Sequence, residues 1–254
     1  RRAEVYNTAV SVGGLTDLDA TLIFPHRERV NNHNCQCLST MEAINGCMGH
    51  VSNAIYYPIG SKLTKEEVTH QLDKALMAPE VLEVCVGARV ASCTSLSDGD
   101  EDVPNGTIGT VVRFESVPSH GSSGKSSKVP VVCFDGVRGQ TTMVVTPTDM
   151  KLQAVAREGA YACRHQIPLV LAWAVTVHRC QGLSMDAAVM DLAPCFVSGM
   201  VYVALSRVRS VEGVHVPSFA REKVRAESCV ASFYSTQRDV GFVFLDCVIP
   251  TRNV

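Results

Sequence analysis

The chain has 254 residues, of which 46% are hydrophobic, and a formal net charge of −2. This composition is that of a globular protein of one large or two modest domains, and it excludes fibrous and disordered proteins. The longest apolar run, from Ile167 to Val177, is shorter than the roughly 20 residues that span a bilayer, and the start shows no signal peptide. The chain lacks the basic excess typical of nucleic-acid-binding proteins, although a few well-placed cations are enough for such binding.

The chain contains eleven cysteines and no CxxC pair. An odd number at irregular spacing favours free thiols in a reducing compartment. The spacing Cys35-x-Cys37 places two thiols on different faces of a helix or strand, whereas zinc sites use C-x2-4-C spacing. We therefore interpret these cysteines as buried helix thiols and keep a zinc site as the alternative for one cluster: His33, Cys35, Cys37, Cys47 and His50.

The first predicted elements are a strand and a helix that follows it at once. The apolar run Thr21–Phe24 ends at Pro25, and the stretch from Arg27 to Met41 has the pattern of a surface helix. A second helix is expected from Thr64 to Met77, with Thr64 as its N-cap. A strand joined directly to a helix is the unit of an α/β sheet.

The spacing of apolar residues changes after residue 81. Asn105-Gly106 is a strong turn signal within this region. Short runs with the alternation or β-branched composition of strands occupy Leu82–Ala91, Thr107–Phe114, Val129–Phe134 and Thr141–Val145. We expect these runs to form a small SH3-like β-barrel inserted into the α/β domain.

The α/β pattern returns after Arg164. The expected strands are Pro168–Ala174, Ala187–Leu192 and Val214–Val216, and the expected helices begin at Thr176, span Val197–Arg207 and surround Ala226–Tyr234. A small basic cluster precedes the last of these helices, and we interpret it as a solvated helix face: Arg221, Lys223 and Arg225.

The segment from Gly121 to Ser126 resembles the phosphate-binding loop G-x-x-x-x-G-K-[ST]. However, Ser119 occupies the position of the first glycine, and the segment lies in a Ser-rich loop between two predicted strands. A phosphate-binding loop needs a strand before it and a helix after it. We therefore interpret the segment as a flexible hairpin loop.

Two segments carry residues suited to phosphate chemistry. Ala172 to Asp186, AWAVTVHRCQGLSMD, is an apolar strand that leads into a polar turn with His178 and Arg179 as donors. Val201 to Arg207, VYVALSR, is an apolar helix that ends on one cation, which can stabilise charge on a transferred phosphoryl group. From these residues alone, a helix C-terminal arginine and a partly buried histidine remain open as alternatives.

The two segments resemble the fifth and sixth motifs of the Pif-type (petite integration frequency) superfamily-one DNA helicases. Leu22–Pro25 is similar to the fourth motif of that family. In the family pattern, Arg179 replaces the usual Lys, Cys180 a small Ser or Ala, and Met200 a Gln. The resemblance implies an α/β fold, namely a RecA-like P-loop NTPase second lobe at 1–81 and 166–235, an inserted SH3-like β-barrel at 82–165 and a tail at 236–254.

The resemblance also implies residue roles. Arg207 is the catalytic arginine finger at the γ-phosphate of ATP. Two sets of contacts accompany it: Gln181, Gly182 and Arg27 for ATP, and Thr176, His178, Arg179 and Ser184 for single-stranded DNA. Mg²⁺ and most of the ATP site belong to a first RecA-like lobe, and no metal site is expected in this chain.

These features predict the C-terminal half of an ATP-dependent 5′-to-3′ DNA helicase that acts in repair, recombination or telomere maintenance, in the nucleus or mitochondrion. The expected partners are single-stranded and forked DNA and a first lobe in cis, with no membrane. The chain starts with Arg1 rather than Met, so we expect a fragment that does not hydrolyse ATP alone. The alternatives are a non-motor nucleic-acid or partner-binding module and the helicase part of a rolling-circle transposon protein.

Overall fold

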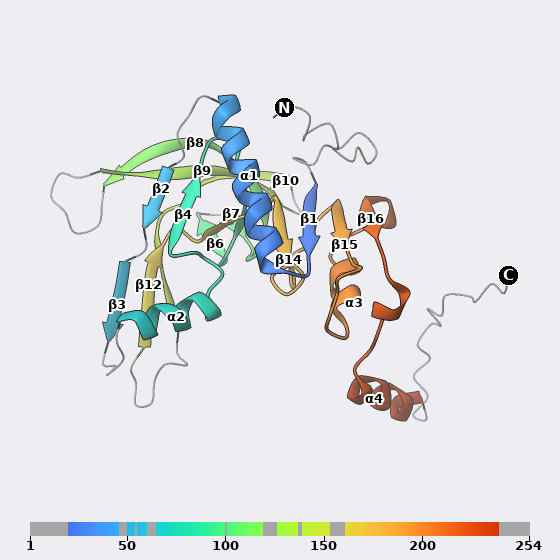
Figure 1. Ribbon diagram of the computed structural model, residues 1–254. Helices are drawn as coiled ribbons and strands as arrows, with labels where there is room; N and C mark the ends of the chain where they lie inside the picture. The colour runs from blue at the N-terminus through green and yellow to red at the C-terminus, as the bar shows by residue number, and fades with distance from the viewer. Residues whose placement is uncertain are drawn as a thin grey trace.

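The computed structural model describes residues 20–45, 50–53, 55–59, 65–99, 101–118, 126–136, 139–152 and 161–238. Within these ranges a parallel sheet lies beside a group of antiparallel sheets (Figure 1). No helix in the described ranges combines the length and the apolar character needed to cross a membrane.

The parallel sheet has the strand order β14-β1-β15-β16. Its strands are β1 (Thr21–Phe24), β14 (Ala174–Thr176), β15 (Ala188–Asp191) and β16 (Val214–Ser218). Ile23 of β1 and Met190 of β15 are fully buried, as expected for a parallel sheet covered on its faces. The predicted strands at Thr21 and Ala187 are thus confirmed.

Helix α1 (Arg27–Asn45) packs beside β14 and β1 (Figure 1). Its buried positions recur at helical spacing: Val30, Asn34, Cys37 and Leu38. The predicted helix is confirmed and extends beyond Met41. The side chains of Cys37 and Leu38 join the core of the antiparallel region, so α1 connects the two parts of the molecule.

Asn34 attaches α1 to the edge of the parallel sheet. Its Nδ2 donates to the carbonyl oxygen of Ala174 at 3.0 Å, and its Oδ1 accepts from the backbone N–H of Ala174 at 2.8 Å. Because β14 is an edge strand, this side-chain amide supplies the partners that a further strand would otherwise provide.

The main antiparallel sheet has the order β10-β9-β8-β5-β13. Its strands are β5 (Arg89–Ser92), β8 (Ile108–Pro118), β9 (Ser126–Gly136), β10 (Gly139–Val144) and β13 (Leu169–Leu171). The predicted strands Thr107–Phe114, Val129–Phe134 and Thr141–Val145 are confirmed. The predicted run Leu82–Ala91 is not one strand, because its first half pairs in a separate sheet and only its second half lies in β5. The predicted barrel is not seen, because the sheet keeps two free edges, β10 and β13, and no closed barrel forms among the described strands.

Three smaller sheets complete this region. The first has three strands in the order β11 (Thr148–Leu152), β12 (Tyr161–Gln166) and β3 (Ile55–Ile59). The second pairs β2 (His50–Asn53) with β4 (Val81–Val84). The third pairs β6 (Leu96–Asp98) with β7 (Glu101–Val103). Helix α2 (Lys65–Ala75), predicted from Thr64, is held against β12 by the buried Arg164. The guanidinium of Arg164 donates to the carboxylate of Asp73 at 2.6 Å and to the carbonyl of Ala78 at 2.9 Å.

The prediction of one strand from Pro168 to Ala174 is wrong. The run divides between two sheets, with β13 pairing with β5 and β14 pairing with β1. Trp173 lies between the two strands and is 1% exposed in the antiparallel core. The packing of this ring explains the break, because the backbone changes sheets where the indole enters the core.

The predicted helix start at Thr176 is also wrong, since Val177–Gly182 forms successive turns. The two later helices are present with different bounds: α3 covers only Met200–Leu205 of the predicted Val197–Arg207, and α4 spans Ser228–Arg238. The basic cluster starts on a short 3-10 turn, Arg221–Lys223, rather than on an α-helix. Of the segment that resembles a phosphate loop, only Ser126 lies among the described residues, at the start of β9.

Candidate nucleotide and nucleic-acid interface

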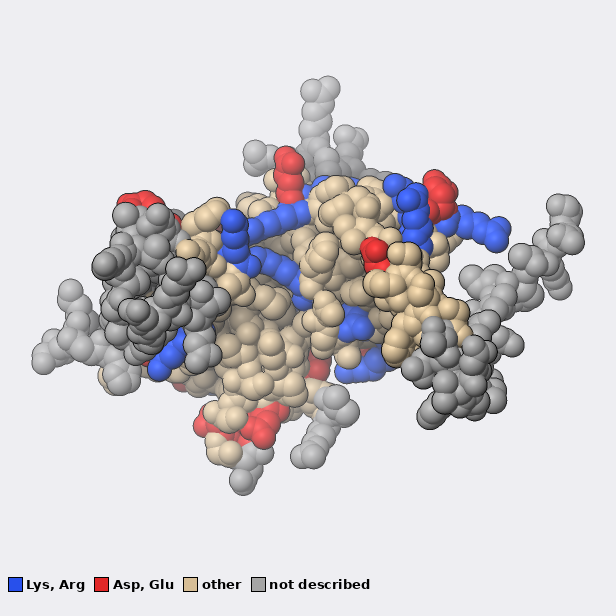
Figure 2. All heavy atoms as spheres, turned by 90° about the horizontal axis from the view of Figure 1, so that it is seen from below, with Lys and Arg blue, Asp and Glu red and all other residues tan. Residues whose placement is uncertain are grey.

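The turn of the first predicted motif follows the carboxyl end of β14, and the carboxyl ends of the parallel strands face the viewer in Figure 2. The two motifs join where the first one leads into β15. The backbone N–H of Met185 donates to the carbonyl of Arg207 at 3.0 Å, and that of Arg209 returns to Met185 at 3.1 Å. A parallel bridge joins Met185 to Val208. The end of the second motif is therefore fixed to the first by backbone bonds.

Arg207 is half-buried beside the turn of the first motif. Its Nη1 donates to the carbonyl of Leu183 at 3.5 Å, and its Nε donates to the carbonyl of Val203 at 2.9 Å. Its Nη2 donates to the Oγ of Ser206 at 2.9 Å. The guanidinium is thus folded back on the last turn of α3, next to the residues that follow Gly182.

The turn itself is ordered by Thr176. This residue is 7% exposed, and its Oγ1 accepts from the backbone N–H of Arg179 at 3.2 Å. Gly182 has φ 89° and lies exposed, with open space where a Cβ would stand. In the structure, Thr176 therefore holds the turn in place through its bond to Arg179. The other predicted contacts on this turn are accessible: Gln181, His178 and Ser184 are exposed, and Arg179 is half-buried.

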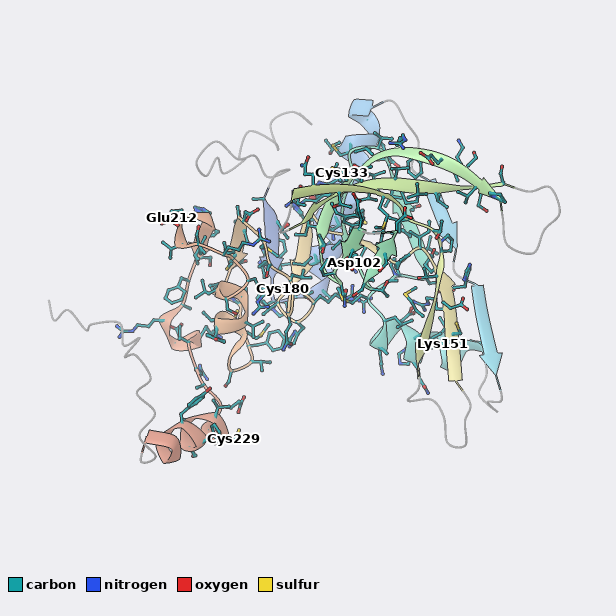
Figure 3. The ribbon with its side chains drawn as sticks, turned by 180° about the vertical axis from the view of Figure 1, so that it is seen from behind. Asp102, Cys133, Lys151, Cys180, Glu212 and Cys229 are labelled. Carbon is teal, nitrogen blue, oxygen red and sulfur yellow. The ribbon has the colours of Figure 1, made fainter. Side chains whose placement is uncertain are left out.

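Cys180 fills the space beneath this turn, and Figure 3 labels it beyond the end of β1. Its Sγ donates to the carbonyl of Val177 at 3.0 Å. Burial raises the pKa of the thiol to about 12, against the lowering effect of the nearby Arg207. Cys180 is accordingly a neutral packing residue at neutral pH.

Arg27 lies within electrostatic range of Arg179. Burial, followed by the charge of Arg27, lowers the pKa of Arg179, while Cys93 acts in the opposite direction. The structure thus brings a predicted ATP contact and a predicted DNA contact together.

Two contacts at this end of the molecule were not predicted from the sequence. The ring of His26 stacks on Phe196, with centroids 5.2 Å apart and an interplanar angle of 17°. Gly106, in the turn before β8, approaches Leu183 so closely that a Cβ on Gly106 would lie 2.2 Å from its Cδ2. The Asn105-Gly106 turn signal locates the turn but carries no information on its neighbour.

The possible zinc cluster finds no support in the described part of the chain. Cys35 is exposed, whereas Cys37 is buried with its Sγ 3.4 Å from the Nε2 of His33. Cys47 and the side chain of His50 lie outside the described residues. Among those that are described, no group of three or more His, Cys, Asp or Glu side chains is arranged to hold a metal ion.

Comparison with known proteins gives one consistent set of relatives, although no family model matches the chain. The ATP-dependent DNA helicase PIF6 of Trypanosoma brucei brucei is 32% identical over 219 residues, which cover 85% of this chain and 25% of the helicase. The crystal structure of Pif1 helicase from Candida albicans has a TM-score of 0.67 at 29% identity, covering 87% of this chain and 50% of that one. A Bacteroides Pif1 helicase in complex with ADP-AlF3 and ssDNA shares the fold, with a TM-score of 0.57 at 22% identity over 94% of this chain and 51% of that one.

The parallel sheet and the joined motifs define a RecA-like lobe of the helicase class. More narrowly, the chain is a relative of the Pif1-type ATP-dependent DNA helicases, which confirms the resemblance found in the sequence. It spans about a quarter of the length of the curated relatives that it matches and about half of the solved Pif1 chains.

Proposed function

We propose that this chain is the C-terminal motor lobe of an ATP-dependent DNA helicase that moves 5′ to 3′ on single strands. The observation that carries the proposal is the junction of the two motifs, in which the Arg207 carbonyl accepts from Met185 and the Arg207 guanidinium reaches the Leu183 carbonyl. One cation thereby lies beside an exposed turn at the carboxyl end of a parallel sheet, the end at which α/β sheets bind ligands.

ATP fits this site as one half of a nucleotide-binding cleft. The exposed Gln181 and the unobstructed Gly182 offer a surface for phosphate, and Arg207 offers the positive charge. When bound, ATP supplies the γ-phosphoryl group that is transferred to water. Arg207 would stabilise the charge that develops there after exchanging its bond to Val203 for one to phosphate.

Magnesium and the remaining ATP contacts are proposed for a first RecA-like lobe in cis. Among the described residues, no group of three or more His, Cys, Asp or Glu side chains is arranged to hold a metal ion. We therefore expect the 254-residue chain by itself not to hydrolyse ATP.

Single-stranded and forked DNA are the proposed nucleic-acid partners. His178, Arg179 and Ser184 present donors on one turn, with Thr176 fixing the turn from below. The ssDNA complex of the Bacteroides helicase, which shares this fold, supports the assignment. We further propose residues 82–165 as an SH3-like subdomain inserted in the lobe formed by 1–81 and 166–235, followed by a tail at 236–254. The proposed setting is DNA repair, recombination or telomere maintenance in the nucleus or mitochondrion.

Substitution of Arg207 in the full-length protein tests the motor function. Arg207→Ala should lower the kcat of DNA-stimulated ATP hydrolysis by about 10³-fold, because the transition state loses its cation. The matched control is Arg209→Ala, which removes an exposed arginine from the same loop, where it pairs with Asp186. Its kcat should remain close to that of the wild type. A kcat within a few-fold of wild type for Arg207→Ala, with DNA binding retained, would instead favour a non-motor binding module.

A further inference from the structure

Strands β1 and β14 end opposite one another in the parallel sheet. They run parallel with Phe24 opposite Thr176, and the backbone N–H of Val177 donates to the carbonyl of Phe24 at 3.1 Å. Two residues beyond the paired positions, each strand is followed by a histidine and then an arginine: His26-Arg27 after β1 and His178-Arg179 after β14. The register of the sheet therefore delivers two His-Arg pairs to one edge.

The two arginines form an uncompensated pair of charges. Arg27 is exposed, Arg179 is half-buried, and the charge of the first, together with burial, lowers the pKa of the second. In the described part of the chain neither guanidinium forms an ion pair with a carboxylate. Arg29, two residues further along α1, by contrast forms an ion pair with Asp191. Like charges held together without a counter-charge favour the binding of an anion between them.

An exposed aromatic ring lies next to this pair. His26, adjacent to Arg27, stacks on Phe196 from the loop after β15. Phe196 is 60% exposed. In Figure 2, Lys and Arg side chains gather over the middle of this face. Proteins hold single strands with positive charges along the backbone and with aromatic rings on which bases stack, and this edge offers both kinds of group.

We propose that Arg27 and Arg179 share one phosphate of a single-stranded nucleic acid, and that the exposed surface of Phe196 stacks on a base beside that phosphate. The proposal rests on the proposed function and deepens it. It assigns Arg27 a contact with the nucleic acid in place of the predicted contact with ATP. It also adds His26 and Phe196 to the residues that line the single-stranded nucleic acid. The first turn of α1 begins at Arg27, so its free N–H groups lie at the same edge and favour the same anion.

The arginine pair is tested in the full-length protein with a fluorescent oligothymidine in the absence of ATP. Arg27→Ala, Arg179→Ala and the double variant are each titrated at several salt concentrations. If one phosphate is shared, the double variant weakens binding by less than the product of the two single effects. Its slope of log K against log salt then falls by about 0.7, the value for a single phosphate contact. Multiplicative effects and a slope change of about 1.4 would mean two separate phosphates and would overturn the shared site.

The phosphate bound by Arg27 could also belong to ATP, and a second measurement distinguishes ATP from the nucleic acid. The KM for ATP is determined at saturating oligothymidine, where Arg27→Ala should leave it within about twofold of wild type. A several-fold rise in this KM with unchanged oligothymidine affinity would return Arg27 to the nucleotide and refute the proposal. Failure of the motor function is seen independently, as absent DNA-stimulated hydrolysis in the wild type.

The stacking contact has its own variants. Phe196→Ala should weaken oligothymidine binding by about 5-fold or more, the range found for lost base stacking, and Phe196→Trp should retain it. The matched control is Phe219→Ala, which removes another exposed ring, 54% exposed, that follows β16 on the far side of the sheet from β14. Thermal unfolding curves verify that each variant is folded. Equal affinity of Phe196→Ala and the control would remove Phe196 from the residues that line the single-stranded nucleic acid.

Discussion

At the scale of single residues, Cys180 shows how burial controls a titration. Burial raises the pKa of its thiol to about 12, from an ordinary value of 9.0. The neutral thiol is the form that folding favours, so the stabilisation is fully present below pH 9. It declines as the pH rises toward 12, because the unfolded chain ionises while the folded one does not.

This difference predicts an alkaline loss of stability that depends on one thiol. Between pH 8 and pH 10 the wild type should lose about 1.4 kcal/mol through Cys180, a loss that Cys180→Ala lacks. The difference in unfolding free energy between the two proteins, measured in urea, should shrink by that amount. Cys35→Ala, which removes an exposed thiol, is the control and should show no such narrowing. If the difference in unfolding free energy between the wild type and Cys180→Ala stayed the same from pH 8 to pH 10, burial would not perturb the pKa of this thiol.

At the scale of elements, the contact of α1 with β14 depends on Asn34. Asn34→Ala leaves both backbone groups of Ala174 without their side-chain partner, and should lower the free energy of unfolding by roughly 2 to 4 kcal/mol. Asn34→Asp places a carboxylate oxygen against the carbonyl of Ala174 at a buried position, so the loss should be at least as large as for Asn34→Ala. Asn32→Ala, on the exposed face of the same helix, should change stability by less than about 0.5 kcal/mol. Equal losses for Asn32→Ala and Asn34→Ala would show that helix propensity, and not the sheet contact, is what matters.

Elements whose signals are local could be predicted from the sequence. The β1 strand ends just before Pro25, and α1 repeats its buried positions at helical spacing, so both were predicted. The division of Pro168–Ala174 could not be predicted, because the run is continuously apolar and its two halves differ only in their distant partners, Val90 for Leu171 and Leu22 for Ala174.

The site divides in the same way. The motif residues around Gly182 and Arg207 were identified from their sequence pattern, and the structure brings these segments together. The proximity of Arg27 to Arg179 follows from the register between β1 and β14, which no local pattern encodes. The predicted helix start after Thr176 failed because the side chain of Thr176 and the positive φ of Gly182 stabilise turns there instead.

At the scale of the whole molecule, the antiparallel region supports the first motif through the turn at Gly106. The backbone N–H of Gly106 is bonded to the carbonyl of Ser92 at 2.9 Å, which fixes the turn to β5. Leu183, 4% exposed, packs against the turn and lies directly between Gly182 and Ser184 of the motif. A displacement of this turn should therefore reach the predicted ATP and DNA contacts.

Gly106→Ala in the full-length protein tests this support. The added methyl would stand 2.2 Å from Leu183 at a backbone φ of +84°, so both packing and backbone conformation resist it. Gly99→Ala is the matched control, because it has φ +62° but open space around its Cβ. The control should lower the unfolding free energy by about 1 kcal/mol through φ alone, and Gly106→Ala by about 2 to 4 kcal/mol. DNA-stimulated ATP turnover should fall several-fold only for Gly106→Ala, since only that variant displaces Leu183. Equal stability losses and equal turnover for the two variants would show that the antiparallel region does not support the motif through this turn.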